Sequence, residues 1–181
     1  MRFDPSLAEM RFGCGLSPAI APPDSVDAML DGLLAPDSMA TRFPIETYSV
    51  FMERLREGRR LNVLRRQNRG TEAGQEAAKL SRQNQQAARK AHIDWMGASI
   101  ARRVHTTTAF RERLEGFWAD HFTATGKRGV ARRSTSPYVE TAIRPYMTGR
   151  FDALLISAVT HPVMLHYLDQ DRSIGPNSPR G

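Results

Sequence analysis

The sequence predicts an all-α protein: an irregular multi-helix domain with a long Arg/Gln-rich helical arm. Apolar residues recur at helical spacing in most segments, and Ser, Thr, Asp, Gly and Pro stand where helices start or stop. No segment alternates apolar and polar residues in the way that is typical of a β-strand. The 181 residues are 40% hydrophobic, which is enough for one core, so a single domain over 1–181 is expected.

The first predicted helix covers residues 24–35, with Asp24 or Ser25 as its N-cap and Pro36 as its stop. Apolar residues follow at the i, i+3, i+4, i+7 and i+8 spacing of one helical face: Val26, Met29, Leu30, Leu33 and Leu34.

A second helix is predicted over 46–69, apolar at its start and Arg-rich after it, with Gly70 and Gly74 expected to interrupt it. The segment 73–104 is rich in Ala and Gln and has mostly small apolar residues before Trp95. It is therefore expected to be an exposed arm or a long helix with little core contact. Together, residues 53–104 form a predicted basic helical arm.

The core is expected in residues 108–168. One helix is predicted from the N-cap Thr108 to a stop at Gly126, followed by a mobile loop over 126–134. Later helices are expected to start at Ser136-Pro137, after Gly149 and at Pro162, with Pro145 kinking or dividing the first of them. The helical spacing predicts one contiguous core: Phe110, Leu114, Phe117, Trp118, Leu154, Leu155, Met164 and Leu165. Residues 169–181 carry turn chemistry and are expected to form a loop.

Composition excludes several classes of protein. No apolar run is long enough to span a membrane, and the N-terminus lacks the apolar region of a secretory signal. A cytoplasmic location is the resulting expectation. The single cysteine, Cys14, excludes an intramolecular disulfide framework and a Cys-rich metal site.

Three segments resemble one bacterial family, the domain of unknown function 1800. RFGCGLSP (11–18) is similar to its N-terminal Arg, Gly and Pro turn, and ERLEGFWADHFTA (112–124) is similar to its aromatic helix. The segment 142–179, with its Pro-x-Met-Leu-x-Tyr-Leu-Asp run, resembles the family's most specific block. Asp120 stands where the family commonly has Asn.

The resemblance carries no established activity, so no catalytic role follows from it. It implies that the family's block continues into an acidic helix and a second half of comparable length. The present 181 residues are therefore expected to be the N-terminal portion of a longer chain. The expected partner is a protein, either that missing C-terminal half or a second copy.

Residue chemistry offers weak candidates for catalysis. His121 lies beside Asp120, and a carboxylate can bias the pKa or tautomer of an imidazole. The aromatic neighbours of His121 at helical spacing favour a core histidine instead. The sequence has neither a nucleophile elbow nor a phosphate-binding glycine loop, so no cofactor is assigned.

A metal site finds little support. The candidate ligands are Asp169, Asp171, His161 and His166, yet the five-residue step between the two histidines does not place both on one helical face. The run from Asp169 resembles a calcium loop only faintly, because Ile174 and Arg180 stand where that loop needs Gly and Glu.

The basic arm is the other candidate site. Between Glu53 and His92 there are eleven Lys and Arg against four Asp and Glu. Arg59, Arg60, Arg65 and Arg66 are the candidate anion-binding residues of that arm. Nucleic acid is an unlikely partner, because no aromatic residues stand between Phe51 and Trp95 to stack on bases.

The sequence therefore favours a structural or interaction module. Two alternatives stay open: part of an enzyme whose active site the C-terminal half completes, and a weak nucleic-acid or anionic-surface binder acting through the Arg-rich arm.

Overall fold

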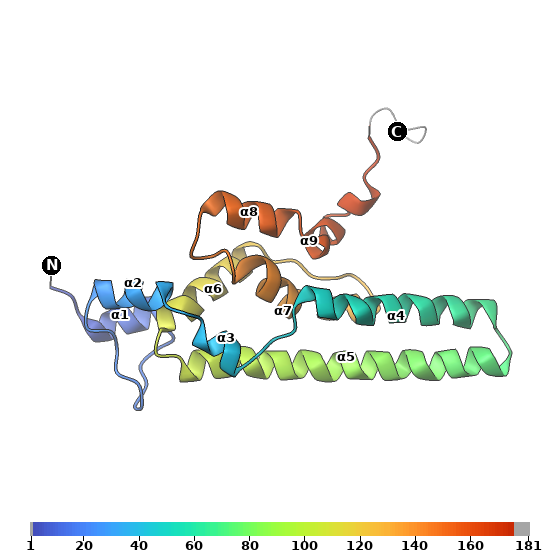
Figure 1. Cartoon of the computed structure of the whole chain (residues 1–181), viewed down its shortest axis with the longest axis horizontal. Helices are drawn as coiled ribbons and strands as arrows, with labels where there is room; N and C mark the ends of the chain where they lie inside the picture. The colour runs from blue at the N-terminus through green and yellow to red at the C-terminus, as the bar shows by residue number, and fades with distance from the viewer. Residues whose placement is uncertain (1, 176–181) are drawn as a thin grey trace.

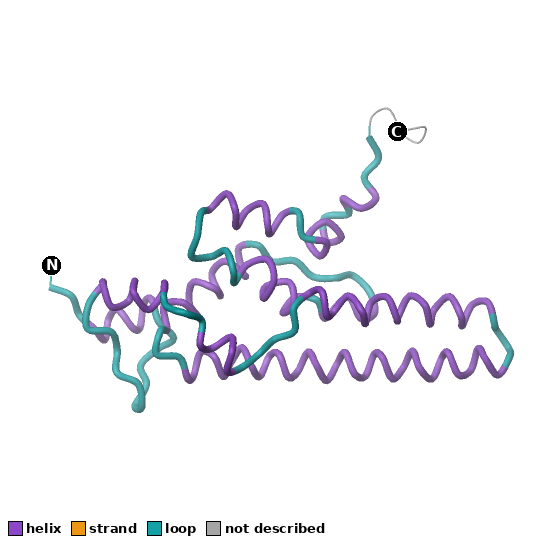
Figure 2. The backbone as a smooth tube through the Cα atoms, viewed as in Figure 1, coloured by secondary structure: helices purple, strands orange, loops and turns teal. Residues whose placement is uncertain are grey.

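A computed structural model describes residues 2–175 of the chain. Helices and their connections account for these residues, with no strand among them, which confirms the all-α class (Figures 1 and 2). Residues 176–181 of the expected 169–181 loop lie outside the described residues. The preceding part of that segment contains a 3₁₀ turn over Gln170–Arg172.

Three short helices form the N-terminal segment: α1 (Pro5–Phe12), α2 (Val26–Leu34) and α3 (Ser38–Arg42). Each begins at a side-chain cap, because Asp4, Ser25 and Asp37 accept hydrogen bonds from the backbone N–H of the third residue after each of them. The Ser25 cap confirms the predicted start of α2.

The arm is an antiparallel helical hairpin of α4 (Tyr48–Gln67) and α5 (Glu72–His105), which extends away from the other helices (Figure 1). Gly70, at φ +83°, makes the turn, and Gly74 belongs to the first turn of α5. The expectation of little core contact for 73–104 was wrong. Ala88 and Trp95 of α5 pack with Phe51 of α4 in a buried cluster.

The segment 126–134 is not the mobile loop that the sequence suggested. Gly129–Arg133 forms a 3₁₀ turn, and its Val130 side chain packs into the cluster of Phe51, Ala88 and Trp95. Gly126 is not a helix stop either, because α6 (Ala109–His121) ends before Phe122. A Cβ on Gly126 would lie 2.1 Å from the carbonyl oxygen of Ala131, so glycine is needed there for close approach of two backbone segments.

The next helix, α7 (Thr135–Tyr138), follows Ser134 rather than Ser136 and continues into a π-helical turn over Val139–Ile143. The run ends at Ile143, two residues before Pro145, which cannot donate the next helical hydrogen bond. The sequence predicted a kink or a division of the helix at this proline, and the helix ends there instead. Then α8 (Phe151–Val159) and α9 (Pro162–Tyr167) lie over α6 and α7 (Figure 1).

The main core differs from the predicted one. Of the eight predicted residues, Leu154 and Met164 are buried in it and Trp118 packs partly buried against it, whereas Phe117 is 57% exposed. The buried cluster is formed by Phe122, Ala124, Tyr138, Ala142, Ile143, Leu154, Ala158, Val163 and Met164. The predicted set failed because the inward face of α6 is partly polar and binds buried charges instead of apolar side chains.

Candidate functional site

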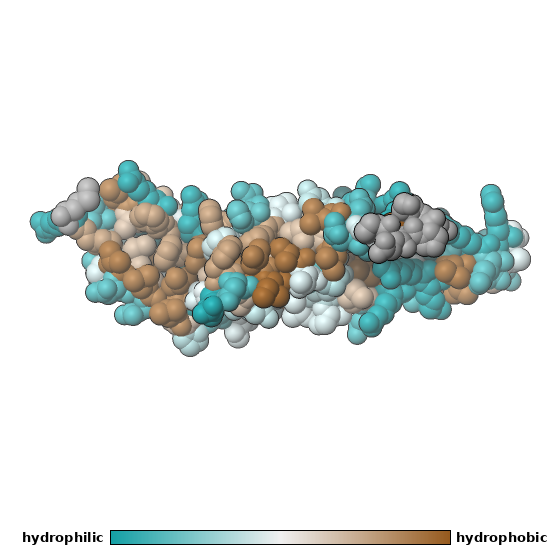
Figure 3. Space-filling model, turned by 90° about the horizontal axis from the view of Figure 1, so that it is seen from above, coloured by the Kyte–Doolittle hydropathy of each residue, from teal (hydrophilic) through white to brown (hydrophobic). Residues whose placement is uncertain are grey.

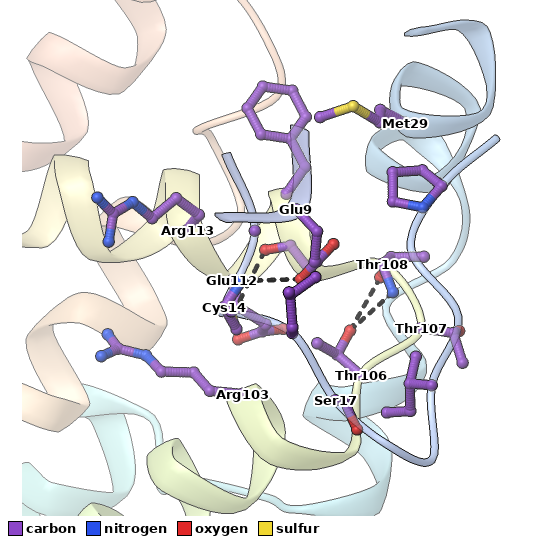
Figure 4. Close-up of a pocket in the computed structure, with 18 of the residues that line it drawn as sticks. Glu9, Cys14, Ser17, Met29, Arg103, Thr106, Thr107, Thr108, Glu112 and Arg113 are labelled. Carbon is purple, nitrogen blue, oxygen red and sulfur yellow. Dashed lines mark hydrogen bonds between the residues drawn. The ribbon is translucent and has the colours of Figure 1, made fainter. Parts of the chain in front are cut away.

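A pocket of about 860 Å³ lies between α1, the 13–25 loop, α2 and the junction of α5 with α6 (Figure 4). Apolar side chains form much of its wall: Met10, Leu16, Ile20, Met29, Val104 and Phe110. Polar groups from α1, the 13–25 loop, α5, α6 and the connection between α5 and α6 also line it: Glu9, Cys14, Arg103, Thr107, Glu112 and Arg113. Arg103 and Arg113 extend in the same direction from α5 and α6 (Figure 4).

Cys14 is the potential nucleophile in this pocket. Its backbone N–H donates to Glu9 Oε1 at 3.1 Å, and its Sγ lies 3.8 Å from the carbonyl oxygen of Ala109. Partial burial raises the pKa of the Cys14 thiol, although Arg103 and Arg113 act in the opposite direction. A raised pKa keeps the thiol protonated at neutral pH, so this cysteine lacks the activation that nucleophilic catalysis needs.

The strongest polar geometry lies beneath the pocket, where Arg144 is bound by two carboxylates. Its Nε and Nη2 donate to Asp37 at 2.6 and 2.9 Å, and its Nη1 and Nη2 donate to Glu112 at 3.0 and 2.6 Å. Desolvation alone would lower the pKa of Arg144, but these hydrogen bonds outweigh it and raise that pKa. The pKa of Asp37 is lowered, because hydrogen bonds from Arg144 and the Ala40 N–H outweigh its own desolvation.

Two further buried arginines bind backbone carbonyl groups of the N-terminal segment. Arg102 donates through Nε to the carbonyl of Phe43 at 2.9 Å and pairs with Glu140 at 2.8 and 3.0 Å. Arg111 donates to the carbonyl groups at the C-terminal end of α2, those of Leu33 and Ala35. We call Arg102, Arg111 and Arg144 the clasp arginines, since together they hold residues 33–43 onto α5, α6 and the π-helical turn.

The sequence analysis missed the clasp arginines because it considered the number of arginines in the chain and not the position of each one on its helix. One signal was present: Ser81, Ala88, Trp95 and Arg102 follow each other at seven-residue steps and are all buried on α5. An arginine that continues the buried heptad positions of a helix is thereby marked as a buried residue. No comparable signal marks Arg144.

The weak catalytic pair is not assembled as a site. His121 and Asp120 are both exposed at the C-terminal end of α6, and only Asp120 lines the pocket. His121 was expected in the core, and this was wrong: its ring stacks on Phe117 at a centroid distance of 6.2 Å on the surface. Its aromatic neighbours are real, but they surround the ring at the edge of α6 and not inside the core.

The four candidate metal ligands divide into separate environments. The His161 ring is buried between Tyr48 and Tyr138, and its Nδ1 accepts a hydrogen bond from the Val163 N–H at 3.2 Å. Burial lowers the pKa of His161 to about 4.

The other candidate ligands lie at the end of α9 and beyond it. His166 Nδ1 is 3.4 Å from Asp171 Oδ2, and Asp169 pairs with Lys127 at 2.5 Å. Within residues 2–175, no three His, Cys, Asp or Glu side chains come together in a way that could hold a metal ion.

The candidate anion-binding residues Arg59, Arg60, Arg65 and Arg66 are all exposed on α4. Arg60 is neutralised locally, because its Nε and Nη2 each donate to Glu57 at 2.7 Å. Arg59 and Arg66 are seven residues apart and so share one face of the helix, whereas Arg65 lies on a flank.

These features define a helical domain whose N-terminal segment is fastened by buried arginines beside an amphipathic pocket. The chain belongs to the family described as protein of unknown function (DUF1800), whose model matches residues 8–178. No curated protein and no solved structure matches the chain. Across the described part of the chain, no helix is both long and apolar enough to cross a membrane.

Proposed function

We propose that this chain is an interaction module that binds protein through the outer side of α8 and α9. The observation that carries the proposal is an uncovered apolar surface, here called the α8–α9 face. It consists of Phe151, Leu155, Ile156, Val159, Leu165 and Leu168, and all six side chains are exposed.

The α8–α9 face is distinct from the buried side of the same helices. Leu154 and Ala158 of α8 point into the core and are 2% and 0% exposed, whereas Ile156 is 60% exposed. Apolar residues therefore lie on both the buried and the exposed side of α8, with Asp152 among the exposed ones. Apolar residues on two sides are typical of a helix that is buried on more than one side in its functional state. From above, hydrophobic residues gather over the N-terminal end and over the middle of the molecule, and hydrophilic residues predominate toward the outer end of the arm (Figure 3).

A protein segment fits this face better than a small molecule does. The pocket at α1, α2, α5 and α6 is not lined by residues of α8 or α9, so it lies apart from the α8–α9 face. A group of exposed apolar side chains of this kind is typical of a protein interface. We propose the C-terminal half implied by the family resemblance as the partner, with a second copy as the alternative outcome.

The test compares residues 1–181 with a chain extended by its downstream sequence. Ile156→Glu is introduced into both, and the melting temperature is measured by circular dichroism. We expect a larger loss in the extended chain, because the glutamate is buried there and solvated in the shorter one. Ile93→Glu on the exposed side of α5 is the matched control, because Ile93 is 57% exposed and lies outside the α8–α9 face, and it should act equally in both chains.

A second readout addresses the alternative partner. If a second copy covers the face, residues 1–181 alone form dimers in sedimentation velocity and Ile156→Glu abolishes them. The proposal is wrong if Ile156→Glu has the same effect in both chains and leaves the sedimentation of residues 1–181 unchanged.

A further inference from the structure

Charge is separated along this molecule. Residues 1–52 contain three Lys and Arg against seven Asp and Glu, and residues 53–92 contain eleven against four. The fold places α2 at one end of an elongated molecule and the α4–α5 turn at the other (Figure 1). The acidic and basic segments therefore lie too far apart for α2 to contact the outer arm of its own chain.

The acidic surface is a stripe along α2. Asp27 and Asp31 are one turn apart on one face of α2, Asp24 stands just before the N-cap Ser25, and all three acidic side chains are exposed. Within the described residues, none of them forms an ion pair. An exposed apolar stripe runs beside them: Val26, Leu30 and Leu34, with Leu34 71% exposed.

The basic surface lies on α4 and, like the α2 surface, combines charged side chains with an exposed apolar residue. The inward side of α4 is marked by the buried Phe51 and Leu61, which face α5. The opposite side carries Arg56, Arg59 and Arg66 around Val63, all of them exposed. Among the ion pairs of the described residues, none includes these three arginines.

We infer that α2 of one copy docks against the outward side of α4 of a second copy. Carboxylates of the α2 stripe pair with the arginines, and the α2 apolar stripe covers Val63. The partner is a second copy because the chain itself contains both complementary surfaces and cannot bring them together within one molecule. This contact uses neither α8 nor α9, so it is independent of the α8–α9 face.

Electrostatic pairing gives the contact a defined dependence on salt. The screening length shrinks from about 10 Å at 0.1 M to about 3 Å at 1 M, so exposed ion pairs weaken over that range. We expect sedimentation coefficients that rise with protein concentration at low salt and stop rising at high salt. Ile156→Glu should leave this association unchanged, because Ile156 lies on the α8–α9 face. The experiment can therefore disprove docking between α2 and α4 without disproving the proposed function, and the reverse also holds.

Charge reversal at the two surfaces is the decisive experiment. The acidic-stripe variant carries Asp24→Lys, Asp27→Lys and Asp31→Lys, and the arm variant carries Arg56→Glu, Arg59→Glu and Arg66→Glu. Each variant alone should stay monomeric, because like charges then face each other. Mixing the two should restore association, since the basic α2 of one variant meets the acidic arm of the other.

The control variant carries the same change in net charge as the arm variant at exposed positions that belong to neither surface: Arg128→Glu, Arg150→Glu and Arg172→Glu. It should associate like the unaltered chain, and helical circular dichroism should confirm that every variant is folded. The inference is overturned if the mixture stays monomeric, or if the acidic-stripe variant associates as well as the unaltered chain. The latter result would assign the arm to an acidic partner other than this chain.

Discussion

Arg144 and Glu112 form a two-point ion pair between the π-helical turn and α6. The side chains are 4% and 1% exposed, and the Nη2–Oε1 distance is 2.6 Å. Removing one partner of a buried pair leaves the other charge desolvated without compensation, so the arrangement makes both residues sensitive to single substitutions.

We expect Arg144→Met to lower the free energy of unfolding by about 3–5 kcal/mol, because Glu112 keeps its buried charge and loses its counter-ion. Urea unfolding followed by circular dichroism measures the loss. The control is Arg150→Met at the exposed Arg150–Asp152 pair, which should change stability very little. In the double variant with Glu112→Met, a loss equal to the sum of the single losses would contradict the coupling.

His161 should make the fold sensitive to moderate acid. Burial lowers the pKa of His161 to about 4, so the unfolded chain binds a proton more readily than the folded one between pH 6.5 and 4. Stability is fully present above that interval and falls as the pH falls through it, by up to about 3 kcal/mol.

The variant His161→Asn measures this contribution, because an Asn oxygen can accept the Val163 N–H without titrating. Urea unfolding at several pH values between 7 and 4 should show a shallower loss for His161→Asn than for the unaltered chain. Parallel curves for the two proteins would show that another group causes the loss.

Glu115 should give stability the opposite pH dependence to that of His161. Burial on α6 raises the pKa of Glu115, and Glu112 adds to the effect, although Arg144 opposes it. The folded chain therefore binds this proton more readily than the unfolded one, and stability is lost as the pH rises through the raised value. We expect Glu115→Gln to increase the melting temperature at pH 7, with the gain shrinking in acid. A decrease at pH 7 would show that the 3.9 Å approach of Arg103 outweighs desolvation.

Two glycine-to-alanine substitutions should change the stability of the fold in opposite directions. Gly126→Ala forces a Cβ to 2.1 Å from the Ala131 carbonyl oxygen, so the backbone must move, and the 3₁₀ turn that contains Val130 and Ala131 should loosen and lower the stability. Gly97→Ala meets no atom within 4 Å on the exposed side of α5 and should stabilise the helix by about 1 kcal/mol. Thermal unfolding of both variants tests the pair, and equal effects would contradict the crowding at Gly126.

Helical periodicity predicted the elements of this fold better than it predicted their packing. The spacing from Val26 to Leu34 located α2 to within two residues, because local caps and apolar spacing decide where a helix lies. The same spacing implied that this face is buried, yet Val26, Leu30 and Leu34 are exposed. Periodicity shows which residues share a face and says nothing about whether another element covers it.

The buried charges explain why the predicted core and site were incomplete. Phe117 was assigned to the core and Glu112 was not, although α6 buries Glu112 and exposes Phe117. The carboxylate is stable inside only because Arg144, far away in the sequence, reaches it, and no local pattern records that pairing. The Cys14 pocket was missed for a related reason, since four distant elements form its walls.

The clasp arginines hold residues 33–43 through specific contacts, as a protein holds a peptide that binds it one to one. A cut before α4 would leave Arg111 without its carbonyl partners and Arg144 with only one of its two carboxylates. A protein starting at residue 48 should therefore be a poorer folding unit than its hairpin and core suggest. Conversely, a peptide spanning residues 33–43 supplied separately should bind such a shortened chain and restore part of its stability, as a missing subunit does.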